Sequence, residues 1–110
     1  MSVHEHVVVV GSTMMDMVAY TSKIPQAGET VSGDSVALGF GGKGANQAVM
    51  ARRLGATVSL VNTLGDDLFG DSTLTNFLEE GIDTSGISRV HGASGVAPIW
   101  VEPDGTNRII

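Results

Sequence analysis

Four glycines within six positions constrain this chain more than any other feature of its sequence. They occupy positions 39, 41, 42 and 44 of the segment GFGGKGANQAV, which runs from Gly39 to Val49. Glycine loses more backbone freedom on folding than any other residue, so a cluster of this kind is costly to order. A helical pattern follows at once, which predicts a tight entry into a helix whose first amide groups have no helical partners.

Two interpretations of the cluster make it a turn or a nucleotide loop. The glycines can be purely structural, allowing a tight turn and a helix that packs closely on a sheet. Gly39, Gly41 and Gly44 also satisfy the G-x-G-x-x-G pattern of dinucleotide loops, but the strand before them is half-polar rather than buried. The P-loop pattern fails, because Gly44 follows Lys43 where Ser or Thr should bind Mg²⁺.

The third interpretation is a pocket for a small polyhydroxyl ligand. Glycines let the backbone approach a ligand, and the helix start supplies free N–H donors. Lys43 adds an ammonium donor, and the side-chain amide of Asn46 both donates and accepts. Asp16 is the candidate carboxylate, because it follows the first predicted strand at the end where ligands collect in open α/β sheets. A turn-capping role for Asp16 is the alternative.

The order of predicted elements indicates an α/β body with a parallel sheet. Strands are predicted at residues 7–10, 16–20 and 58–64, the first and last of them buried, and helices at residues 45–54 and from 66 or 67 to about 80. Asp66 or Asp67 is expected to cap the second helix, and Gly55 and Gly81 to end the two helices.

Two segments fit this body poorly. Residues 30–38 alternate as in a half-exposed strand interrupted by a turn or bulge. Residues 96–101 and 108–110 flank the turn PDGT and predict a hairpin. We expect 30–38 and 96–110 to form a small antiparallel sheet apart from the parallel body.

Composition and chain ends exclude several classes of protein. Twelve acidic residues against six scattered basic ones give a formal charge of −6, which argues against a nucleic-acid surface. The absence of cysteine excludes disulfides and thiolate metal sites. The valine run near the N-terminus is too short for a signal peptide or a membrane span, so we expect a soluble cytoplasmic protein. The uncapped apolar end at Ile109 and Ile110 favours a piece of a longer chain.

Four motifs, in order, resemble the N-terminal part of the ribokinase-like (PfkB) family of carbohydrate kinases. They are VVVVGSTMMDMV, IPQAGETV, GFGGKGANQAVMARRLGA and LGDDLFGD, and the resemblance runs from about Val7 to Ile110. It implies that residues 1–110 form the N-terminal part of a ribokinase-like domain, with a parallel-sheet body and a small antiparallel β lid. The later G-A-G-D motif of the family, with its catalytic Asp and the ATP site, is absent. No residue present is therefore assigned as a catalytic base, a cofactor ligand or a metal ligand.

The resemblance also implies a role for each matching residue. Asp16 would hold two sugar hydroxyls, Lys43 would contact the sugar from the loop, and Asn46 would bind a further hydroxyl from the first helical turn. The expected substrate-binding set is Met14, Asp16, Gly41, Gly42, Lys43, Gly44 and Asn46. Met14 departs from the pattern, since many bacterial members have at this position an Asn that touches the sugar. A thioether donates no hydrogen bond, so one contact is lost or replaced by packing.

For the complete enzyme, the resemblance implies transfer of the γ-phosphoryl group of ATP to O5 of D-ribose, with Mg²⁺ and a monovalent cation such as K⁺. The lid would close over the sugar and pair with a second lid in a homodimer. The fragment alone is expected to be inactive, because it lacks the ATP site. Two alternatives remain: a kinase of the same family acting on another sugar or a nucleoside, and a non-catalytic sugar-binding or dimerising module.

Overall fold

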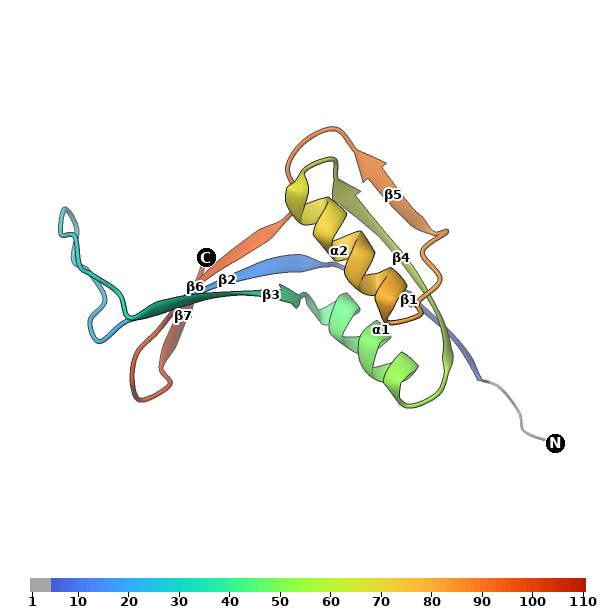
Figure 1. The fold of residues 1–110 in the computed structure, drawn as a ribbon, viewed down its shortest axis with the longest axis horizontal. Helices are drawn as coiled ribbons and strands as arrows, with labels where there is room; N and C mark the ends of the chain where they lie inside the picture. The colour runs from blue at the N-terminus through green and yellow to red at the C-terminus, as the bar shows by residue number, and fades with distance from the viewer. Residues whose placement is uncertain (1–4) are drawn as a thin grey trace. The chain divides into compact units, whose positions relative to one another are not determined.

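The computed structural model describes residues 5–110, which form seven strands and two helices (Figure 1). The elements are β1 (His6–Val10), β2 (Met14–Tyr20), β3 (Ser35–Gly41), α1 (Lys43–Arg53), β4 (Thr57–Gly65), α2 (Leu68–Glu79), β5 (Ile87–Val90), β6 (Val96–Val101) and β7 (Asn107–Ile109). They divide into two compact units. The first unit comprises residues 5–15 and 40–95, and the second comprises residues 16–39 and 96–110.

The first unit is built on a parallel sheet in the order β1-β4-β5. β4 is the central strand, pairing Val7 with Val58 on one side and Asn62 with Ile87 on the other. The predicted parallel body is thus confirmed. Strand β5 was not predicted, because its four residues, ISRV, carry no continuous apolar run, and in the structure they are mostly exposed. Its pairing with β4, a tertiary contact, makes it a strand.

One face of the parallel sheet packs on both helices. The core joins Val9, Val58 and Leu60 of the sheet to Ala45 and Ala48 of α1, and Phe77 of α2 and Ile82 complete it. The prediction that residues 7–10 are buried on both faces was wrong: Val9 is 8% exposed, but Val8 is 58% and Val10 77% exposed. Successive side chains of a strand point to opposite faces, so only alternate valines reach the helices.

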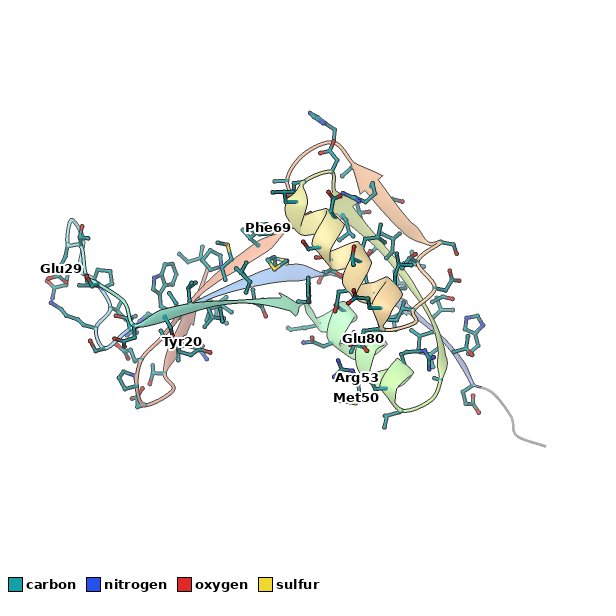
Figure 2. All side chains as sticks on the ribbon, in the orientation of Figure 1. Tyr20, Glu29, Met50, Arg53, Phe69 and Glu80 are labelled. Atoms are coloured by element: carbon teal, nitrogen blue, oxygen red, sulfur yellow. The ribbon has the colours of Figure 1, made fainter. Side chains whose placement is uncertain are left out.

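The two helices are also joined at their C-terminal ends. Figure 2 shows the side chains of Arg53 and Glu80 close together there, and Nε of Arg53 donates to Oε2 of Glu80 at 3.0 Å. Arg52 adds a hydrogen bond from its Nε to the carbonyl oxygen of Gly81 at 3.2 Å. These contacts fix how the ends of α1 and α2 meet.

The second unit contains a four-stranded sheet in the order β3-β2-β6-β7. The predicted hairpin is confirmed: β6 and β7 pair antiparallel, with Ile99 opposite Ile109. The sequence placed the first lid strand at residues 30–38, but β3 begins only at Ser35. Residues 30–34 form a loop instead, and the amide of Asp34 donates to the carbonyl oxygen of Tyr20 where pairing with β2 begins. β3 consequently extends into the glycine cluster.

Candidate functional site

The glycine cluster forms the junction between β3 and α1. Gly41 is the last residue of β3 and is buried, Gly42 is the N-cap residue of α1, and the helix begins at Lys43. The helix starts two residues earlier than predicted. Gly42 has φ 100° and ψ 139°, a left-handed conformation that side chains rarely adopt. Glycine is therefore required by the backbone at this corner.

The corner packs tightly against the segment that connects β1 to β2. A Cβ atom placed on Gly42 would lie 2.6 Å from the carbonyl oxygen of Ser12 and 2.9 Å from the amide nitrogen of Met14. One placed on Gly44 would lie 2.6 Å from the carbonyl carbon of Gly11. Two of the four glycines thus make room for another part of the backbone, as the structural interpretation of the cluster expected.

The start of α1 leaves backbone donors available. The amide of Ala45 donates to Ser12 O at 3.2 Å, and that of Asn46 begins the helical pattern by donating to Gly42 O at 2.9 Å. Within residues 5–110 the backbone N–H groups of Lys43 and Gly44 donate no hydrogen bond. No acidic residue lies in the first turn, so the positive end of the helix dipole is uncompensated there. This corner suits an electron-rich ligand group such as a hydroxyl oxygen.

The side chains predicted to bind a sugar are accessible at this corner. Lys43 and Asn46 are exposed, and in the described part of the chain neither side chain forms a hydrogen bond or an ion pair. Met14 is partly buried and lies in the same unit. Its sulfur would be 2.8 Å from a Cβ on Gly95, so the thioether packs against the backbone at Gly95. The first unit therefore contains six of the seven expected residues.

Asp16 belongs to the second unit. It lies on β2, two residues after Met14, and a Cβ on Gly39 of β3 would be 3.9 Å from the Asp16 Cβ. Its carboxylate is partly buried and accepts no hydrogen bond from any residue that the structure describes. The capping alternative for Asp16 thus has no supporting contact. Its convergence with Lys43 and Asn46 on one ligand stays a prediction.

The acidic turn after β4 is structural. Asp67 caps α2 by accepting a hydrogen bond from the amide of Gly70 at 2.9 Å. Asp66 instead accepts from the amide of Gly92 at 2.9 Å and pairs with the ring of His91 at 3.0 Å. These bonds, that from Gly92 above all, lower the pKa of Asp66. Of the two caps that the sequence left open, the structure selects Asp67.

The sequence did not reveal the pair of residues, Asn62 and Thr13, that links the central strand of the sheet to the segment packed against the glycine corner. Asn62 of β4 donates from its side-chain amide to the hydroxyl of Thr13 at 2.5 Å, and Thr13 is buried. The only signal in the sequence was an amide within the apolar strand segment VSLVNTL.

Among residues 5–110 no three side chains of histidine, aspartate or glutamate are arranged to hold a metal ion. No helix in that range is long and apolar enough to cross a membrane.

Comparison with known proteins identifies the family. Residues 4–110 match the pfkB family carbohydrate kinases. Because the match spans nearly the whole sequence, the chain belongs to this family of carbohydrate kinases.

Individual relatives point the same way. The chain is 42% identical over 105 residues to a deoxyribokinase of Salmonella typhimurium and 45% identical over 105 residues to a ribokinase of Mus musculus. Each alignment covers 94% of this chain but only 34% and 32% of those proteins. The chain thus spans about a third of the length of the curated relatives it matches.

Solved structures agree on the fold. A ribokinase from Giardia lamblia matches 98% of this chain with a TM-score of 0.88 at 35% identity, over 35% of its own length. A ribokinase of Arabidopsis thaliana, solved with ribose and ATP, matches 98% of this chain with a TM-score of 0.85 at 30% identity, over 36% of its length. The predicted fold class, a parallel-sheet body with a small antiparallel sheet as in ribokinase-like structures, is confirmed.

Proposed function

We propose that this chain is the sugar-binding part of an ATP-dependent kinase that phosphorylates D-ribose at O5, giving ribose 5-phosphate. The observation that carries the proposal is the corner at Gly42, where two backbone amides, the ammonium group of Lys43 and the amide of Asn46 are available together at a helix start. A sugar offers hydroxyl oxygens to such donors. Family membership and the relatives called ribokinase support this choice of ligand.

Each residue has a defined task in this proposal. The Asp16 carboxylate accepts hydrogen bonds from two sugar hydroxyls, while Lys43 and Asn46 bind others. Phosphoryl transfer asks a protein chiefly for positioning and charge neutralisation, and this chain supplies the positioning. Part of the sugar's binding energy is thereby used to orient its primary hydroxyl for attack.

The remaining chemistry belongs to parts of the complete protein outside this chain. We assign the ATP site, Mg²⁺, K⁺ and the catalytic base there, because the G-A-G-D motif that carries the family's catalytic Asp does not occur in residues 1–110. ATP supplies the phosphoryl group that the sugar hydroxyl accepts. The neighbour solved with ribose and ATP supports both substrates.

We further propose that the four-stranded sheet of the second unit closes over the sugar and pairs with the sheet of a second copy. Its exposed apolar side chains support pairing, among them Val36, Leu38 and Ile109. Closure would exclude water, which otherwise competes with the sugar for the phosphoryl group. A cytoplasmic location, with which a chain without cysteine is compatible, completes the proposal.

A second candidate substrate is 2-deoxyribose. The Salmonella typhimurium deoxyribokinase is 42% identical to this chain. Met14 supports the same alternative. Its thioether can pack against a sugar carbon that lacks a hydroxyl, but it cannot donate a hydrogen bond to a hydroxyl.

The decisive experiment measures kcat/KM of the complete protein with ATP against ribose, 2-deoxyribose, fructose and adenosine. The proposal expects the highest value for ribose and production of ribose 5-phosphate. A higher value for 2-deoxyribose would transfer the assignment to the second candidate. Sugar binding without turnover of any of the four compounds would instead favour a non-catalytic module.

A further inference from the structure

The side chain of Asn62 makes a contact that the proposed site does not use directly. Asn62 lies on β4, the central strand of the parallel sheet, and its Nδ2 donates to Oγ1 of Thr13 at 2.5 Å. Thr13 is only 9% exposed and immediately precedes β2. The hydrogen bond therefore ties the middle of the sheet to residues 11–13, the segment that connects β1 to β2.

The same connecting segment supports the glycine corner from its other side. Ser12 O accepts a hydrogen bond from the amide of Ala45 at 3.2 Å, and Gly42 and Gly44 lie too close to the segment to accommodate a Cβ atom. The segment thus contacts Asn62 of β4 through Thr13 and the first turn of α1 through Ser12. Because protein interiors are closely packed, a shift of the segment must move the corner as well.

The carbonyl oxygen of the Asn62 side chain indicates that this residue does more than stabilise the fold. Its Oδ1 is buried and has no hydrogen-bond partner among residues 5–110. A buried acceptor without a partner is destabilising, and an apolar side chain on this strand would avoid that cost. The contribution that remains for the amide is its hydrogen bond to Thr13.

We propose that Asn62 is a positioning residue for the sugar site. Through Thr13 it fixes residues 11–13, and through them the backbone donors of Lys43 and Gly44. The inference rests on the proposed function, since it takes those donors to face the sugar. Small misplacements of donors weaken binding strongly, whereas the nucleotide, held elsewhere, is unaffected.

The kinetic test uses Asn62→Leu, Thr13→Val and the double variant in the complete protein. We expect each single variant to raise KM for the sugar about tenfold while KM for ATP stays within about twofold. The double variant should be no worse than the singles, because all three remove the same hydrogen bond. Thr13→Ser retains a hydroxyl that can accept the hydrogen bond from Asn62, so its KM for the sugar should equal that of wild type. Asn76→Leu, on α2, is the matched control, since its side chain forms no hydrogen bond in the part of the chain described.

A second readout does not depend on activity. Hydrogen–deuterium exchange of the peptide spanning residues 42–50 should be at least about threefold faster in Asn62→Leu than in wild type, and unchanged in Asn76→Leu. Unchanged exchange would overturn the inference, as would an unchanged KM for the sugar or parallel rises in both KM values. A wild type that phosphorylates no sugar would overturn the proposed function instead, and the exchange rates would then decide this inference alone.

Discussion

Asp67 and Ser94 are joined by two hydrogen bonds: the Asp67 carboxylate accepts from the Ser94 hydroxyl at 2.6 Å and from its amide at 2.9 Å. The same carboxylate caps α2 by accepting from the amide of Gly70. One side chain therefore fixes both the start of a helix and the loop that follows β5. The Ser94 hydroxyl, the Ser94 amide and the Gly70 amide lower the pKa of Asp67 to about 2, from an ordinary value of 3.8.

This pKa predicts a specific dependence of stability on pH. Since the pKa of Asp67 is lower in the folded than in the unfolded state, its contribution is complete well above pH 3.8 and disappears as the pH falls through about 2. Asp67→Asn should therefore lose less stability than wild type over that interval in urea denaturation of the complete protein. The exposed Asp34→Asn is the control. Parallel acid profiles for wild type and Asp67→Asn would contradict the linkage.

Gly42→Ala should be more damaging than Gly55→Ala. The two glycines have nearly the same φ, 100° and 104°, but a Cβ on Gly55 would have no neighbour within 4 Å. We expect backbone strain alone to cost about 1 kcal/mol at Gly55, whereas strain and overlap together cost about 2–4 kcal/mol at Gly42. Thermal unfolding of the two variants measures the difference. Equal losses would show that the close approach to Ser12 is not maintained in solution.

Phe77→Ala should destabilise the protein by about 3–5 kcal/mol, because it empties the centre of the core between α2 and the parallel sheet. Phe77 is fully buried, whereas the next residue, Leu78, is 58% exposed. Leu78→Ala on the same helix turn is thus a matched control, expected to cost less than about 1 kcal/mol. Denaturant unfolding compares them, and similar losses would place the core elsewhere.

Asp16→Ala should weaken sugar binding by about 2–4 kcal/mol, since two hydroxyls would lose a charged acceptor. The effect should appear in kcat/KM for the sugar and not in KM for ATP. Asp34→Ala, in the same unit but exposed, is the control. If Asp16→Ala left both KM for the sugar and kcat within about twofold of wild type, the carboxylate would not be part of the site.

Met14→Asn should shift the preference between sugars towards ribose. An amide can donate a hydrogen bond to a sugar hydroxyl, whereas a thioether has no donor. We therefore expect the ratio of kcat/KM for ribose to that for 2-deoxyribose to rise about tenfold. Met50→Asn, an exposed methionine on α1 labelled in Figure 2, should leave the ratio unchanged. An unchanged ratio in Met14→Asn would remove Met14 from the sugar-binding residues.

Local patterns predicted most of the fold. The hairpin around PDGT, the cap at Asp67 and the two helices ended by glycine all follow from side-chain chemistry within a few residues. The misjudged elements depended on partners distant in sequence. β3 begins where Asp34 meets Tyr20, and β5 exists because it pairs with β4.

The candidate site shows the same division. Its chemistry could be read from the sequence, because Lys43, Asn46 and four glycines occur within eight positions of one another. Its support could not, since Asn62 and Thr13 are 49 positions apart and meet only when β4 passes beneath the segment that follows β1.

The amino-acid sequence by itself determined the family, the αβ order of the body and the glycine corner, because each depends on neighbouring residues and on backbone freedom at single positions. Only the tertiary structure decided which valines of β1 are buried and which partner each glycine approaches. Burial and close approach arise between segments far apart in the chain, and their pairing is set by packing rather than by any local preference.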